Sequence, residues 1–168
     1  RAVVEIGLVF YWKDCPPEVQ RRLFIEQLEL ARECGLPVVI HSRDAYADTL
    51  AILKDQGFEG RALLWHCFGG TSREARELVQ AGWHVSIPGP VTFPANRKLR
   101  EALLEIPRDR LRLETDCPYL APLPYRGKRN EPAYTVFTAE ACAKALGMET
   151  GEVWRLCGDN ARRFFGLD

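Results

Sequence analysis

The sequence has no net charge, because its 23 Lys and Arg residues balance its 23 Asp and Glu residues. No global field therefore draws the protein to a polyanion, and any nucleic-acid binding must be local. The sequence also lacks an apolar run near the roughly 20 residues of a membrane span. Its first residues lack the charged region and cleavage pattern of a signal peptide. These absences predict a cytoplasmic protein with no membrane partner.

Cysteine pairs of the CxxC kind are missing as well. The six cysteines are spread along the chain, which disfavours both a structural zinc site and a dense disulfide framework. A reducing compartment is the simpler interpretation. Two of them, Cys67 and Cys117, adjoin candidate site residues, but adjacent residues of a strand point to opposite faces, so we expect both to be buried packing residues.

The length of 168 residues and the 46% apolar content fit one domain, residues 1–168. Short apolar runs alternate with longer stretches at helical spacing, which is typical of a parallel sheet with helices. The expected strands are residues 2–8, 37–40, 62–65, 83–87 and 111–114. The helices between them are expected to end near Gly35, Gly57, Gly82 and residue 105. We expect Asp44 to cap the second helix, Thr71 and Glu74 to form a capping box on the third, and two or three helices to follow residue 135.

Five strands in successive βα units predict an α/β fold, and the polar motifs all fall at strand ends, as in a (β/α) barrel of the TIM type. An open doubly wound sheet is the alternative. A complete eight-unit barrel needs about 250 residues, so we expect about five of the eight units here. The sequence opens directly in a strand with no initiating Met, which suggests that upstream sequence was removed or was never present.

Four possible metal ligands lie within or just after apolar strands: Glu5, His41, His66 and Asp116. Their separations correspond to about one, one and two βα units, so a barrel would bring them to one rim. Each residue alone has a structural explanation, but four such groups at one rim would compete for partners without a metal.

Imidazole and carboxylate ligands without a thiolate suit zinc, manganese, iron or nickel, and the carboxylates bring harder ions into range. Such an ion would supply hydroxide near neutral pH and polarise a phosphoryl or carbonyl oxygen. Asp116 is then the expected general base, since it could both touch the metal and accept a proton from water.

The motifs VEIGL, VVIHSRDA, WHCFGG and ETDCPYL are followed by RGKRNEP and a terminal GDNARRFFGL. In order and spacing this series resembles the TatD family over essentially the whole chain. The resemblance implies a TIM-barrel hydrolase that acts as a deoxyribonuclease at strand ends with one or two divalent ions: magnesium, manganese or zinc. It further implies that Glu5 bridges two metals, that His41 and His66 complete the second metal's ligands, and that Asp116 is the catalytic aspartate near the first.

The sequence departs from the family pattern at two places. The strand ending in His-x-His, which binds the first metal in the family, is absent, and Val9 replaces the aspartate that usually follows Gly-Leu. We therefore expect one tightly held ion and feeble or no nuclease activity from this chain alone.

Basic and aromatic residues near these motifs are candidates for contacts with DNA. Arg43, Arg126, Lys128 and Arg129 could contact phosphates, while Tyr119 and Tyr125 could stack on bases. Tyr11 and Trp12, after the first strand, could help line the cleft. The alternative is that these loops are simply solvated.

Two other functions stay open at this point. One is a metal-dependent amidohydrolase-like enzyme that acts on a small ester, amide or lactone. The other is an inactive fragment that serves as an oligomerising or binding module, because five strands leave unpaired edges that invite a homo-oligomer.

Overall fold

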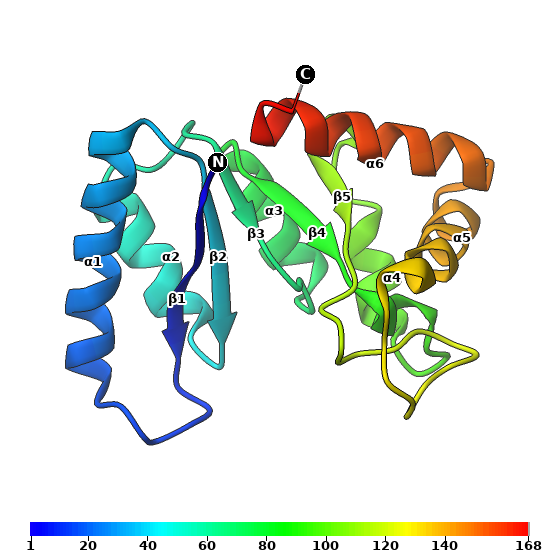
Figure 1. Ribbon diagram of the computed structural model, residues 1–168, viewed down its shortest axis with the longest axis horizontal. Helices are drawn as coiled ribbons and strands as arrows, with labels where there is room; N and C mark the ends of the chain where they lie inside the picture. The colour runs from blue at the N-terminus through cyan, green and yellow to red at the C-terminus, as the bar shows by residue number, and fades with distance from the viewer. Residues whose placement is uncertain (168) are drawn as a thin grey trace.

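The computed structural model describes residues 1–167 and contains one five-stranded parallel sheet (Figure 1). Its strands lie side by side in sequence order: β1 (Val3–Val9), β2 (Val38–Arg43), β3 (Leu63–Trp65), β4 (His84–Ile87) and β5 (Leu111–Leu113). A doubly wound sheet reverses its strand order at a switch point, and this sheet has no such reversal. The sheet is therefore the barrel type, and the barrel is not closed.

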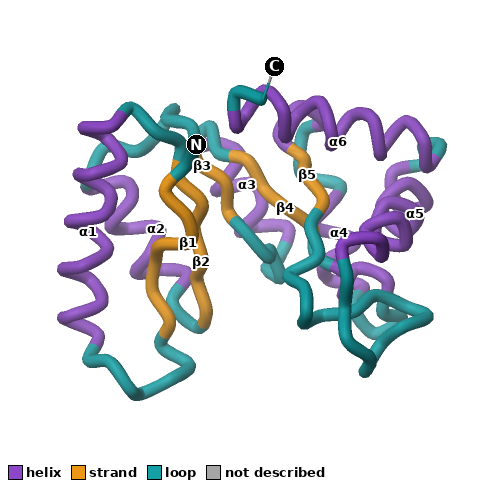
Figure 2. The backbone as a smooth tube through the Cα atoms, viewed as in Figure 1, coloured by secondary structure: helices purple, strands orange, loops and turns teal. Residues whose placement is uncertain are grey.

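Four helices connect the strands: α1 (Pro17–Cys34), α2 (Tyr46–Asp55), α3 (Ser72–Gln80) and α4 (Arg97–Leu103). Short 3-10 turns, η1 (Gly89–Thr92), η2 (Arg108–Arg110) and η3 (Pro132–Tyr134), join other segments. After a long loop, α5 (Thr135–Leu146) and α6 (Thr150–Phe165) close the chain (Figure 2).

The main core lies between the sheet and its connecting helices. Alternate strand residues such as Leu8, Ile40 and Trp65 are buried there. They belong to one cluster with buried helix residues, which include Phe24 and Leu28 of α1, Leu53 of α2 and Leu78 of α3. Because side chains alternate along a strand, the residues between these point to the other face of the sheet. That face, called the inner face below, carries the candidate site.

Helix α6 covers the amino ends of the strands, at the top of Figure 1, where Phe164 packs on Val39 and Leu64. The loops after β1 and β5 lie at the opposite, carboxyl end. Arg112, only 3% exposed, lies on the inner face with its guanidinium 4.6 Å from the Phe164 ring. None of the helices formed within residues 1–167 combines the length and apolar content needed to span a bilayer.

Local signals predicted some helix ends and missed others. The Thr71–Glu74 capping box is confirmed, as is the left-handed Gly35 that ends α1. The prediction that Asp44 caps α2 is wrong: the cap position is Ala45, and no side-chain cap is formed. Two helices follow residue 135, within the expected two or three, and α6 is continuous through Gly158.

Candidate metal centre

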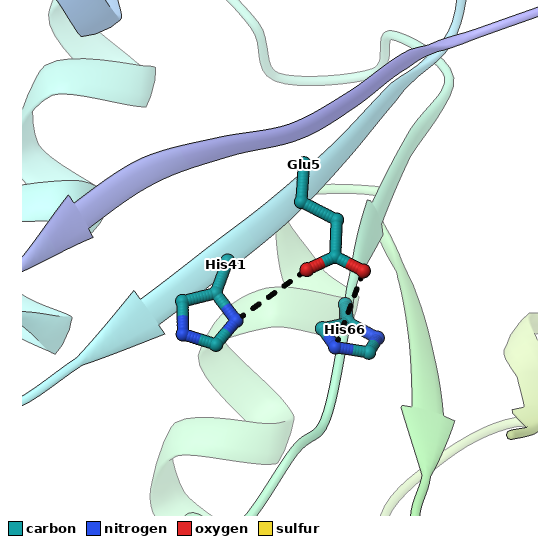
Figure 3. Close-up of side chains that lie close together, drawn as sticks. All are labelled: Glu5, His41 and His66. Carbon is teal, nitrogen blue, oxygen red and sulfur yellow. Dashed lines mark ion pairs between the residues drawn. The ribbon is translucent and has the colours of Figure 1, made fainter. Parts of the chain in front are cut away.

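Three side chains from neighbouring strands meet on the inner face of the sheet (Figure 3). Glu5 lies in the middle of β1, His41 lies in β2, and His66 directly follows β3. The carboxylate of Glu5 is 3.7 Å from Nδ1 of His41 through one oxygen and 3.5 Å from Nε2 of His66 through the other. The alternation that buries Ile6, Ile40 and Trp65 against the helices places these three on the other face.

Asp116 joins this cluster from the loop after β5. Its Oδ1 lies 3.6 Å from Nε2 of His66, the same nitrogen that faces Glu5. The four residues that spacing selected are therefore brought together, although Glu5 lies in mid-strand and Asp116 lies beyond a strand end.

Gly7 allows β1 to approach β2 at this point. It has φ of +148°, is paired with His41, and a Cβ there would collide with the His41 carbonyl oxygen. The glycine two residues after Glu5 therefore permits the close contact of the two strands that carry Glu5 and His41.

The donor set fits a divalent cation. Nε2 of His66 is buried and has no hydrogen-bond partner in the described part of the chain. Its separations of 3.5 and 3.6 Å from Glu5 and Asp116 are too long for good hydrogen bonds. Two ligands that each lie about 2.1 Å from one tetrahedral ion are about 3.4 Å apart, which is close to these separations. The orphaned nitrogen is thus directed at a position where an ion would satisfy it.

Glu114 holds His66 in place and was missed by the sequence reasoning. Its Oε2 accepts a 2.7 Å hydrogen bond from Nδ1 of His66 and a 3.1 Å bond from the backbone N–H of Cys67, and it also contacts the Ser86 hydroxyl. A proton fixed on Nδ1 leaves Nε2 free as a ligand. The available signal was the period of two, which places Glu114 on the same side of the chain as Arg112.

The carboxylates set the protonation of the cluster. Burial by itself lowers the pKa of His66, but the Glu114 hydrogen bond and the nearby charges outweigh it and raise that pKa above its usual value. Burial raises the pKa of Asp116, and the charges of Glu114 and Glu5 add to the effect. A bound cation would relieve this crowding of negative charge.

Three residues with an unusual backbone conformation line one cavity beside the cluster. Cys67, Asp116 and Leu120 have φ of +49°, +55° and +57°, and all three line a cavity of about 690 Å³ that also contains His41 and His66. Non-glycine residues rarely adopt this conformation, and such strain tends to concentrate at functional sites.

The expectation that Cys67 and Cys117 are buried packing residues is wrong. Cys117 is exposed, and Cys67 lines the cavity with Sγ 4.0 Å from Oδ2 of Asp116. Strand alternation does not apply to Cys67, because β3 ends at Trp65 and Cys67 has positive φ. Burial and the surrounding carboxylates raise the pKa of this thiol strongly.

The residues considered for DNA contact fall into two groups. Arg43, Trp12 and Tyr119 line the cavity together with His41, His66 and Asp116. Lining residues of the cavity do not include Arg126, Lys128, Arg129 or Tyr125. Tyr125 stacks on Tyr134 with ring centroids 4.1 Å apart, and Arg126 lies 4.4 Å above Phe93. Both side chains are thus engaged by neighbouring rings.

The chain is similar to several known proteins. It is 42% identical over 167 residues to the uncharacterized metal-dependent hydrolase YabD of Bacillus subtilis, covering 99% of this chain and 66% of that protein. It is 39% identical over 171 residues to the 3'-5' ssDNA/RNA exonuclease TatD of Erwinia billingiae, with coverages of 99% and 66%. The crystal structure of YJJV, a TatD homologue from Escherichia coli K12, superposes with a TM-score of 0.91 at 28% identity, over 99% of this chain and 64% of that one.

The chain thus spans about two thirds of the length of these relatives. The family model described as TatD related DNase matches residues 1–166. With its parallel barrel-type sheet and its cluster of imidazole and carboxylate groups, the chain belongs to the TatD family of metal-dependent hydrolases.

Proposed function

We propose that this chain supplies a metal site and substrate cleft for the hydrolysis of phosphodiester bonds in DNA. The observation that carries the proposal is the buried, unpartnered Nε2 of His66, which faces Glu5 and Asp116 at distances that suit a shared divalent ion. The similarity to the Erwinia billingiae protein named 3'-5' ssDNA/RNA exonuclease TatD supports the same substrate class.

Each residue has a role that follows from its position. Glu5, His41 and His66 would hold the ion, and Asp116 would share it. Zinc, manganese and magnesium all accept ligands from this set. When bound, such an ion supplies hydroxide near neutral pH and polarises a phosphoryl oxygen. Asp116 would accept a proton from the attacking water, and Glu114 would keep Nδ1 of His66 protonated.

A phosphodiester suits the cavity better than a neutral ester, amide or lactone. Arg43 lines the cavity, its guanidinium lies 3.8 Å from the centre of the Tyr11 ring, and within residues 1–167 it forms no ion pair with a carboxylate. A cation held by a ring and left without an acidic partner is available to an anionic substrate. A neutral substrate would leave that charge unused.

The test is degradation of end-labelled single-stranded DNA with Mn²⁺, Mg²⁺ or Zn²⁺. We expect slow cleavage that EDTA abolishes, since no His-x-His is present to complete a second metal site. Asp116→Asn and His41→Ala should each reduce it about 100-fold or more. Asp109→Asn, at an exposed carboxylate on η2, is the matched control and should retain it.

A different result would redirect the proposal. Metal-dependent hydrolysis of a lactone or a nitrophenyl ester, with DNA untouched, would favour the amidohydrolase-like alternative. Unchanged metal binding in His41→Ala would refute the proposed ligand set itself.

A further inference from the structure

Two exposed aromatic side chains stand at opposite sides of the candidate metal centre. Trp12, 58% exposed, lies in the loop after β1, and Tyr119, 70% exposed, lies in the loop after β5. Strands β1 and β5 are the two ends of the sheet, with β3 and its His66 between them. Both rings nevertheless line the same cavity as His41, His66 and Asp116. They therefore flank the ligands from two sides.

Within residues 1–167, neither ring is stacked in parallel on another aromatic ring. Trp12 meets Tyr11 edge to face, at 4.7 Å and 90°, so the two rings are not stacked in parallel. Tyr119 has no aromatic partner among residues 1–167. Tyr125, by contrast, lies parallel to Tyr134 within 3° and contacts Phe137 as well. Burial in the core therefore does not explain the two rings at the cavity.

Arg43 adds a positive charge near Trp12 in the same cavity. It follows His41 by two residues on the same strand, and its guanidinium lies over Tyr11 and 5.9 Å from the ring of Trp12. The cavity thus combines a cation, two open aromatic rings and a carboxylate-imidazole cluster. A nucleotide offers the matching groups, because its phosphate pairs with a cation or metal and its base presents a flat face.

We propose that Trp12 and Tyr119 stack on the bases on either side of the scissile phosphodiester, with Arg43 contacting an adjacent phosphate. This inference rests on the proposed function and assigns the contacts with the bases to two side chains. The volume of about 690 Å³ is ample for one or two nucleotide groups beside the metal ligands.

The test compares two labelled DNA strands with the same phosphate backbone. One carries normal bases, and the other has base-free tetrahydrofuran residues at its terminal positions. Binding is measured by fluorescence anisotropy with Mn²⁺ present, and hydrolysis is measured in parallel. We expect the wild-type protein to bind the base-bearing strand at least 10-fold more tightly than the base-free strand, because each stacked base contributes substantially to affinity.

Variants then assign this preference to the two rings. Trp12→Ala and Tyr119→Ala should each weaken binding of the base-bearing strand about 10-fold and leave the base-free strand unchanged. Trp12→Phe and Tyr119→Phe should restore most of the loss, since phenylalanine also stacks. Trp154→Ala, at an exposed tryptophan on α6, is the matched control and should behave as wild type. Quenching of tryptophan fluorescence by the base-bearing strand should disappear in Trp12→Phe.

The outcomes separate this inference from the proposed function. Equal, metal-dependent binding of both strands by the wild-type protein would overturn the role of the rings and leave a phosphodiester site. Failure of both strands to bind with Mn²⁺ would overturn the phosphodiester site as well. An effect of Trp12→Ala that is equal on both strands would show that the ring only supports the loop.

Discussion

The buried carboxylate of Glu114 offers the sharpest test of the proposed metal site, because its hydrogen bond orients the proposed ligand His66. Its Oε2 accepts the Nδ1 proton of His66 at 2.7 Å and the Cys67 N–H at 3.1 Å. Burial would raise its pKa, but the bonds from His66, Ser86 and Cys67 outweigh burial and lower the pKa below its usual value. Glu114 is therefore a charged acceptor that orients His66.

The perturbation is Glu114→Gln, which keeps the size of the side chain and removes its charge. One amide oxygen must then replace an acceptor that serves three donors, and the amide nitrogen adds donors of its own. Loss of such a supporting bond typically reduces metal affinity by about 10-fold to 100-fold. This corresponds to about 1.4–2.7 kcal/mol.

The assay is calorimetric titration of the metal-free protein with Zn²⁺ or Mn²⁺. We expect the wild-type chain to bind about one ion and Glu114→Gln to bind the same number more weakly. His66→Gln should lose most of the affinity. The matched control is Glu101→Gln on α4, where the carboxylate pairs with Arg97 at the surface and should have no influence on the metal.

Thermal unfolding of each metal-free variant separates orientation from misfolding. A folded Glu114→Gln protein that binds metal with wild-type affinity would refute the reasoning. A variant that is unfolded at the assay temperature would be replaced by Ser86→Ala, which removes one donor to the same carboxylate and should weaken binding less.

Three further predictions concern stability and association. Burial and the charges of Arg112 and Arg110 lower the pKa of His84 to about 4. In the unfolded chain the same histidine has a pKa of about 6.5, so as the pH falls it is protonated there before it is protonated in the folded protein. The stability that is present above pH 6.5 is therefore lost as the pH falls toward 4. After allowance for solvent screening the loss is on the order of 1–2 kcal/mol, and His84→Gln should remove it in urea unfolding at neutral and acidic pH; parallel pH profiles would contradict this. Gly7→Ala should destabilise the fold by roughly 2 kcal/mol or more, because its Cβ meets the His41 carbonyl, and an unchanged melting temperature would contradict that. The unpaired edge of β1, where Val4 is 59% exposed, should promote self-association that Val4→Lys reduces in sedimentation velocity; a wild-type chain that stays monomeric at every concentration would count against it.

Local chemistry explains which parts of the fold could be predicted from sequence. The Thr71–Glu74 box and the left-handed Gly35 depend on hydrogen bonds between residues close in sequence. Asp44 carried the same kind of signal, but its φ of +56° belongs to the turn that leaves β2, so its side chain does not cap α2. Helix α6 continues through Gly158, and Val153, Cys157 and Phe164 are buried along one side of it.

The site was predicted where periodicity applies and missed where it does not. Repeating βα units bring Glu5, His41 and His66 together on one face of a barrel-type sheet, and a spacing argument can find them. Cys67 escaped this argument because its positive φ turns it toward the cavity. Tyr125 looked equivalent to Tyr119 in sequence, and only the parallel stack on Tyr134 distinguishes them.

The sequence by itself therefore determined the order of strands and helices, the parallel sheet and the four candidate ligands. These follow from patterns that repeat within a strand, a helix or a βα unit, where near neighbours in the chain decide the outcome. Only the tertiary structure decided that Glu114 holds His66, that Nε2 of His66 is left without a partner, and that Trp12 and Tyr119 share one cavity. Each of these depends on contacts between residues tens of positions apart, whose distances and orientations are fixed by packing rather than by local pattern.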